Sequence, residues 1–106
     1  MAALSPNLTI MLRAAEKAAK SLVRDFGEVE NLQVSRKGPA NFVSAADTRS
    51  EEIIYNELKK ARPSFGFLME ESGHVASENG ENDFRFIIDP LDGTTNFLHG
   101  IPHFNI

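Results

Sequence analysis

Two short apolar runs that both end in acidic residues constrain the fold of this chain more than any other feature. Residues 65–69 (FGFLM) end abruptly at Glu70 and Glu71, and residues 84–88 (FRFII) end at Asp89. Apolar runs of this length, bounded by polar segments, are typical of buried β-strands. If the two strands are neighbours in one sheet with these ends together, Glu70 and Asp89 lie side by side.

An amphipathic helix is expected at the start of the chain. Ser5 followed by Pro6 is typical of a helix N-terminus, with Ser as the N-cap and Pro at the first helical position. Apolar residues then recur every three or four positions, which predicts a helix that ends at Gly27. Residues 32–35 alternate in polarity and indicate a short strand.

A second helix and a loop complete the expected order of elements. Ser44 with Asp47 three residues later is a weak capping box, and the apolar period that follows predicts a helix that stops at Pro63. Residues 72–83 are rich in Gly, Ser, Asn and Glu and indicate a surface loop. The order of helices and strands indicates a layered fold of the α+β or α/β class.

Composition excludes several classes of function. The chain has 106 residues, enough for one domain, and its 42% hydrophobic and 25% charged residues are typical of a soluble globular protein. Since it has no cysteine, disulfides and thiolate chemistry are excluded, and a reducing cytoplasm fits. A net charge of -4 argues against a nucleic-acid-binding face and leaves a protein partner open. No apolar run spans a bilayer and no secretory signal is visible, so we expect a cytoplasmic protein.

The end of the chain resembles the beginning of a strand. Residues 104–106 are partly apolar and follow a turn at residues 100–102. A strand that stopped at its first residues would leave backbone groups without partners. We therefore expect residues 1–106 to be a fragment of a longer protein.

The acids at the strand ends form a candidate metal site. Asp92 lies three residues after Asp89, beyond a proline, so three carboxylates can converge with Glu70. Converging carboxylates repel one another unless a cation neutralises them, and oxygen ligands without cysteine favour Mg²⁺ or Mn²⁺ over zinc. Gly93 lets the backbone approach a ligand closely, and the N–H groups that follow it suit an anion. Carboxylates beside backbone donors indicate metal-assisted hydrolysis of a phosphate ester.

An ordinary surface explanation competes with this site. Asp-Pro and Asp-Gly pairs, such as those at Asp89 and Asp92, are most common in simple turns. Two adjacent glutamates, such as Glu70 and Glu71, are most often a solvated pair. Taken together with the two apolar strands, the residue pattern supports the metal site and the ordinary turns about equally.

Three segments resemble the inositol monophosphatase family. Residues 86–97 (FIIDPLDGTTNF) are similar to its first signature, residues 67–73 (FLMEESG) to its G-E-E-S-G element, and residues 41–47 (NFVSAAD) to its D-[L/F]-V-T-x-x-D element. Their order and spacing also match, and residues 98–104 (LHGIPHF) are similar to the bacterial branch that includes the extragenic-suppressor phosphatases. The resemblance implies an αβαβα-type sugar-phosphatase sandwich, of which this chain is the N-terminal portion.

The resemblance also implies a role for each acid. Glu70 corresponds to a residue that bridges metal and the nucleophilic water. Asp89 and Asp92 correspond to ligands shared between catalytic ions, and Leu91 to a residue that gives its backbone carbonyl. The cofactor implied is two or three Mg²⁺ ions, with Mn²⁺ as a substitute.

Further residues are implied for the water and the phosphate. Thr94 together with Asp47 is associated with activation of the attacking water, and the backbone N–H groups of Gly93 and Thr94 with the phosphate. From the residue pattern alone Asp47 is a helix cap, because acids are favoured in a first helical turn. Four residues near the motifs are left outside the candidate site because a solvated surface explains them equally well: Lys37, Glu71, His99 and His103.

The implied activity is Mg²⁺-dependent hydrolysis of a small phosphorylated polyol, above all myo-inositol 1-phosphate, by direct attack of water. Inhibition by Li⁺ and a homodimer are implied as well. One alternative is a sister phosphatase acting on fructose 1,6-bisphosphate, histidinol phosphate or a 3′-phosphonucleotide. Another is a regulatory partner of RNA polymerase and its antitermination factors. The family's second signature lies beyond residue 106 and supplies a further Asp ligand, so the chain alone is expected to be inactive.

Overall fold

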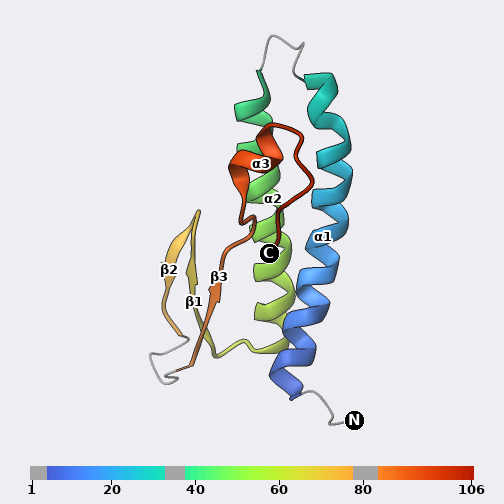
Figure 1. The fold of residues 1–106 in the computed structure, drawn as a ribbon. Helices are drawn as coiled ribbons and strands as arrows, with labels where there is room; N and C mark the ends of the chain where they lie inside the picture. Colours follow the sequence, from blue (N-terminus) through green and yellow to red (C-terminus); the bar gives the residue numbers. More distant parts are fainter. Residues whose placement is uncertain (1–4, 33–37, 78–83) are drawn as a thin grey trace.

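Two long helices lie side by side and carry the rest of the fold (Figure 1). The computed structural model places α1 at Pro6–Leu32 and α2 at Gly38–Ala61. The Ser5 hydroxyl accepts a hydrogen bond from the Leu8 backbone N–H at 3.1 Å, which is the predicted N-cap. The second helix ends shortly before Pro63, also as predicted. The structure describes residues 5–32, 38–77 and 84–106.

The first helix is longer than its sequence pattern indicates. Its predicted end at Gly27 is wrong, because α1 continues to Leu32. Val29 lies beyond the glycine and is fully buried, so packing against the core outweighs the conformational freedom of one glycine. Leu32 is therefore the end of a helix and not the start of a strand, and residues 33–35 of that expected strand lie outside the described residues.

The second helix begins earlier than predicted. It starts at Gly38 instead of near Ser44, because Val43 and Ala46 already pack into the core at 3% and 0% exposure. Asp47 consequently lies in the interior of a helix and not in its first turn. The capping explanation for this aspartate is wrong.

The two apolar runs form strands of one small sheet. The strands are β1 (Gly66–Met69), β2 (Gly73–Val75) and β3 (Arg85–Ile88), in the order β2-β1-β3. β1 pairs antiparallel with β2 and parallel with β3, with Met69 opposite Ile88. The expectation of an uninterrupted loop over residues 72–83 is wrong at β2, and residues 78–83 lie outside the described residues.

Two apolar clusters lie one after the other along the helices. In the first, both helices pack on the sheet, and in the second they pack on α3 (Thr94–Leu98), as Figure 1 shows for the two halves of α2. Between the residues that α2 gives to each cluster lie three buried polar residues: Asp47, Ser50 and Glu51. Their exposed fractions are 6%, 0% and 2%. The polar part of the core thus lies where the two apolar clusters meet.

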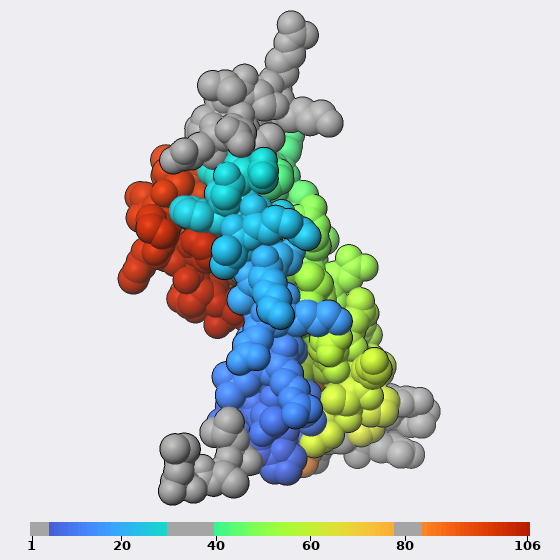
Figure 2. Space-filling view, turned by 90° about the vertical axis from the view of Figure 1, so that its right-hand side faces the viewer, coloured from blue at the N-terminus to red at the C-terminus, as the bar shows by residue number. Residues whose placement is uncertain are grey.

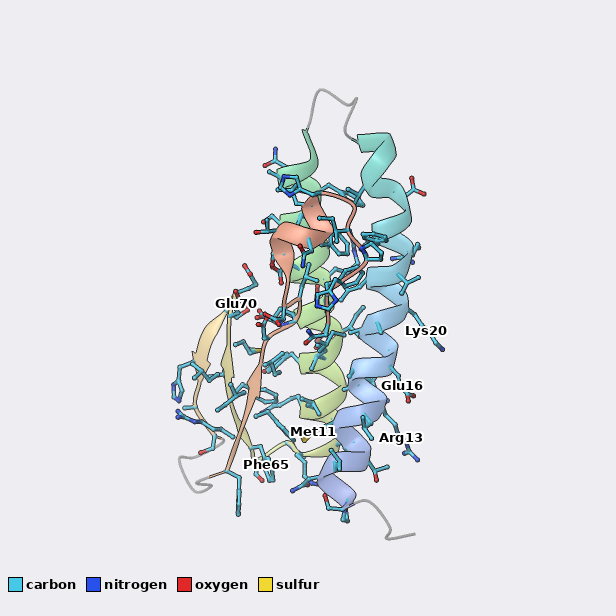
Figure 3. The ribbon with its side chains drawn as sticks, in the orientation of Figure 1. Met11, Arg13, Glu16, Lys20, Phe65 and Glu70 are labelled. Carbon is cyan, nitrogen blue, oxygen red and sulfur yellow. The ribbon has the colours of Figure 1, made fainter. Side chains whose placement is uncertain are left out.

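Helix α1 forms one outer face of the molecule. Figure 2 shows it running between α2 and the C-terminal segment. Its side chains Arg13, Glu16 and Lys20 point away from α2 and the sheet (Figure 3). In the described part of the chain, no helix is long and apolar enough to cross a bilayer. Helices packed on a mixed sheet confirm the predicted α+β class.

The C-terminal residues do not begin a regular strand. Asn105 forms a single antiparallel bridge with Asp92 instead of the expected strand over residues 104–106. The two backbone bonds of this bridge measure 2.8 and 3.0 Å. The bridge holds the C-terminal segment against the loop that follows β3.

Ser50 offers a test of how α2 holds that loop. Its hydroxyl donates to the carbonyl of the buried Pro90 at 2.8 Å. Ser50→Ala would leave this carbonyl without its donor, so we expect the free energy of unfolding to fall by about 1–3 kcal/mol in urea denaturation. The control is Thr48→Ala, because the Thr48 hydroxyl is exposed and bonds only within its own helix. An equal loss of stability in both variants would contradict the assignment.

Candidate metal centre

The parallel pairing of β1 and β3 places Glu70 next to Asp89. Met69 is opposite Ile88, and the Glu70 backbone N–H donates to the Ile88 carbonyl at 3.3 Å. Figure 3 shows Glu70 at the end of β1, level with the point where β3 leads toward α3. The two strands are thus neighbours with their acidic ends together, which is the condition under which the sequence places Glu70 beside Asp89.

Asp89 raises the pKa of Glu70. A hydrogen bond to Asp89, followed by the negative charge of Asp89, raises the pKa of Glu70 to about 7. Burial and the charges of Asp47 and Glu71 act in the same direction. A divalent cation bound between neighbouring carboxylates would relieve their mutual repulsion.

Asp47 reaches the same group of acids from α2. Its side chain is buried, and its Oδ1 atom has no hydrogen-bond partner among the described residues. Burial raises the pKa of Asp47 to about 7, and the nearby carboxylates of Glu71, Asp89 and Glu51 add to the rise. A buried carboxylate oxygen without a partner is costly unless a proton or a metal takes that place.

The loop after Asp89 is organised by its own hydrogen bonds. The Leu91 backbone N–H donates to Asp89 Oδ1 at 3.3 Å, and the Thr94 hydroxyl donates to the Leu91 carbonyl at 3.1 Å. The Leu91 side chain is 1% exposed and packs in the second apolar cluster. Thr94 therefore directs its proton at the Leu91 carbonyl.

Asp92 has a different set of partners. Its side chain is exposed, and the Asn105 side-chain amide donates to Asp92 Oδ2 at 3.3 Å. The structure thus brings Glu70, Asp89 and Asp47 into one electrostatic group and turns Asp92 toward the C-terminal segment.

Gly93 permits the sharp turn into α3. Its φ is 88°, a left-handed conformation that side chains rarely adopt. A Cβ atom there would also lie 2.9 Å from the His103 carbonyl oxygen and 3.2 Å from the Phe104 Cα. No side chain caps α3, which begins at Thr94, so the first backbone N–H groups of the helix have no side-chain acceptor among the described residues.

The carboxylate and carbonyl oxygens of this site suit a hard divalent cation, although their present spacing does not form a complete coordination site. Carboxylate and carbonyl oxygens are the ligands that Mg²⁺ and Mn²⁺ prefer, and the unpartnered Asp47 oxygen lies within this set. Among residues 5–32, 38–77 and 84–106, no three His, Cys, Asp or Glu side chains are arranged closely enough to hold a metal as they stand. The side chains would have to draw together around an ion.

Sequence reasoning missed two buried residues of this region. The Glu51 carboxylate accepts hydrogen bonds from the Glu71 backbone N–H at 2.8 Å and from the Ser72 hydroxyl at 2.6 Å. Ser50, its neighbour, bonds the carbonyl before Leu91. The spacing of Asp47, Ser50 and Glu51, three and four residues apart, puts them on one helix face and was the available signal.

The four residues that the sequence analysis left outside the candidate site lie in different surroundings. Glu71 belongs to the group of acids, because its charge and a hydrogen bond contribute to the raised pKa of Asp47. His99 Nδ1 bonds the Thr95 carbonyl at 2.8 Å, and His103 is exposed. Lys37 lies outside the described residues.

Comparisons with known proteins agree with the motifs. Residues 3–106 match the inositol monophosphatase family. The inositol-1-monophosphatase of Mesorhizobium japonicum is 62% identical over 99 residues, which are 93% of this chain and 36% of that protein. The Nus factor SuhB of Pseudomonas aeruginosa is 37% identical over 103 residues, 97% of this chain and 38% of that protein.

A solved structure supports the same relationship. The extragenic suppressor protein suhB from Bartonella henselae aligns with a TM-score of 0.76 and 64% identity, over 94% of this chain and 38% of that one. The chain therefore spans little more than a third of the length of the relatives it matches.

The raised pKa of Asp47 predicts that the metal-free protein loses stability as the pH rises. The folded pKa of about 7 exceeds the ordinary 3.8, so the folded state binds the extra proton between these values. Stability present at pH 4 is therefore lost as the pH rises through 7. Asp47→Asn should make this slope shallower in urea denaturation with a chelator at pH 5 and pH 8, and the raised pKa of Glu70 accounts for the slope that remains.

A matched control for this prediction is Glu16→Gln on the outer face of α1. It removes one exposed acid far from the group and should keep the slope of the original protein. A slope unchanged in Asp47→Asn would show that Asp47 does not titrate near neutral pH.

Proposed function

This chain belongs to the inositol monophosphatase family, and we propose that it is the N-terminal part of a longer domain that hydrolyses a small phosphate monoester with Mg²⁺. The proposed substrate is myo-inositol 1-phosphate, the products are the alcohol and inorganic phosphate, and the proposed location is the cytoplasm. The observation that carries the proposal is the convergence of Glu70, Asp89 and the buried Asp47 at the ends of two parallel strands.

Four residues at the end of β1 and in the segment after β3 are the proposed ligands for two or three Mg²⁺ ions. Glu70, Asp89 and Asp92 would give carboxylates, and Leu91 would give the carbonyl that Thr94 bonds in this structure. When bound, the ions supply positive charge for the reacting phosphate and make a water more acidic. Mn²⁺ has the same preference for oxygen and would fit the same ligands.

Asp47 and Thr94 are the proposed partners of the attacking water. Asp47 has an unpartnered Oδ1 atom and a pKa of about 7 without metal, which suits a group that accepts a proton near neutral pH. The Thr94 hydroxyl would orient the water while its own proton stays directed at Leu91. The water itself attacks phosphorus, and no side-chain nucleophile is required.

The backbone N–H groups of Gly93 and Thr94 are the proposed phosphate contacts. Gly93 brings the backbone into a left-handed turn that no larger residue would adopt in the space available. The N-terminus of α3 then presents N–H groups without a side-chain cap. Donors of this kind suit the oxygens of a phosphate.

The name of one group of relatives supports a second candidate function. Proteins called Nus factor SuhB are 37–39% identical to this chain, so a regulatory contact with RNA polymerase or antitermination factors is the alternative. The net charge of -4 suits a protein partner better than direct contact with nucleic acid. A sister phosphatase acting on fructose 1,6-bisphosphate, histidinol phosphate or a 3′-phosphonucleotide is the other alternative. A homodimer and inhibition by Li⁺ remain part of the proposal.

The phosphatase proposal is tested with the full-length protein. Phosphate release from myo-inositol 1-phosphate should require Mg²⁺, should stop when a chelator is added and should be inhibited by Li⁺. Glu70→Gln should abolish release while leaving any capture of RNA polymerase from lysate intact, which separates catalysis from a regulatory role. An unchanged rate of phosphate release in the presence of the chelator would contradict the metal-dependent mechanism.

Asp92→Asn tests whether Asp92 binds Mg²⁺, although its side chain points away from Glu70 and Asp89. The amide keeps the shape and the contact with Asn105 but removes the anionic oxygen. We expect Mg²⁺ affinity and activity to fall together, by about 10-fold or more, because one charged ligand is lost. Glu28→Gln, an exposed substitution on α1, is the matched control. Unaltered Mg²⁺ affinity in Asp92→Asn would remove Asp92 from the ligand set.

A further inference from the structure

We propose that Glu51 is a positioning residue that fixes where Glu70 lies relative to Asp89. It acts through the turn that follows β1 and touches neither the substrate nor the proposed ions. The inference rests on the proposed function only in that Glu70 and Asp89 bind Mg²⁺. Its hydrogen bonds are independent of that proposal.

Both oxygens of the Glu51 carboxylate are used on one turn. Oε1 accepts from the Glu71 backbone N–H at 2.8 Å, and Oε2 accepts from the Ser72 hydroxyl at 2.6 Å. The carboxylate is almost fully buried, and hydrogen bonds to a charged acceptor are stronger than neutral ones. The Glu51 side chain of α2 therefore binds the turn that begins with Glu70 through two hydrogen bonds.

The same helix also holds the other acidic segment. Ser50 donates to the Pro90 carbonyl, one residue after Asp89. After the last strand pair, Met69 with Ile88, a backbone bond of 3.3 Å joins the Glu70 N–H to the Ile88 carbonyl. Two adjacent residues of a rigid helix thus hold the two segments that carry the ligands, and the spacing of Glu70 and Asp89 follows from α2.

Glu51 is an unfavourable choice if its role is only to stabilise the fold. Its negative charge lies near Asp47 and opposes the ionised form of that residue. A buried carboxylate also loses its hydration, which an apolar residue at the same place would not. The bonds from Glu71 and Ser72 explain why this position holds a hydrogen-bond acceptor instead of an apolar side chain.

The test compares Glu51→Ala with Glu51→Gln in the full-length protein. Glu51→Ala frees the turn, so Mg²⁺ affinity measured by calorimetry should fall by about 10–100-fold, as for other residues that orient metal ligands. Glu51→Gln keeps an oxygen that accepts the Glu71 N–H, so its affinity should stay within about 3-fold of the original. Hydrogen exchange at the Glu71 amide should be fast in the first variant and slow in the second.

Glu52→Ala is the matched control, because it removes an exposed acid at the neighbouring position of α2. It should change neither Mg²⁺ affinity nor exchange at the Glu71 amide. If Glu51→Ala lowers the melting temperature but leaves Mg²⁺ affinity unchanged, Glu51 is merely structural and the inference is overturned. Equal loss of affinity in Glu51→Gln and Glu51→Ala would overturn it as well, because the charge and not the contact would matter.

Ser72→Ala keeps the inference testable if Glu51→Ala does not fold. Ser72 is exposed, and its substitution removes one of the two bonds and leaves Oε2 of the buried Glu51 without that donor, which weakens the attachment of the carboxylate to the turn. Faster exchange at the Glu71 amide with weaker Mg²⁺ binding is expected, and no change in either would contradict the inference. A protein that binds Mg²⁺ but releases no phosphate would refute the proposed function, whereas the Glu51 result would still stand or fall on affinity and exchange.

Discussion

The register between β1 and β3 is the constraint on which the candidate site depends. Side chains alternate between the faces of a sheet, so a shift of one residue would turn Phe67 and Met69 away from α2. Burial of these two side chains, with Phe86 and Ile88 beside them on β3, therefore fixes the register. The acids that follow then emerge side by side at one end of the sheet. Apolar packing over one half of α2 thus determines where the negative charges meet.

Two buried aspartates differ in whether a cation lies beside them. Asp25 on α1 is 5% exposed and forms an ion pair with Arg49 of α2. Asp47 on α2 is buried to a similar degree, but its Oδ1 has no partner among the described residues and its neighbours are other carboxylates. A buried charge with a cation is part of the packing. A buried acid among acids has a raised pKa, and such groups cluster at functional sites.

Several local patterns of the sequence predicted the structure correctly. Strands β1 and β3, the N-cap at Ser5 and the end of α2 follow from short-range rules, and the meeting of Glu70 with Asp89 follows once these strands are neighbours. The predicted helix end at Gly27 was wrong because the burial of Val29 favours continuing α1 beyond the glycine. The contacts of α2 with the two turns were hidden because they join residues about 20 and 40 positions apart, a separation that no periodicity reports.

The long second helix explains how a site made from turns can be well ordered. Turns alone place side chains loosely, whereas sites supported by helices and strands hold their geometry more closely. Here Asp47 belongs to the group of acids itself, while the adjacent Ser50 and Glu51 each bind one acidic turn. All three lie on one face, between two apolar clusters that prevent α2 from rotating or sliding. A helix fixed in this way can hold mutually repelling carboxylates near one another, and the free energy for doing so comes from the apolar clusters on either side.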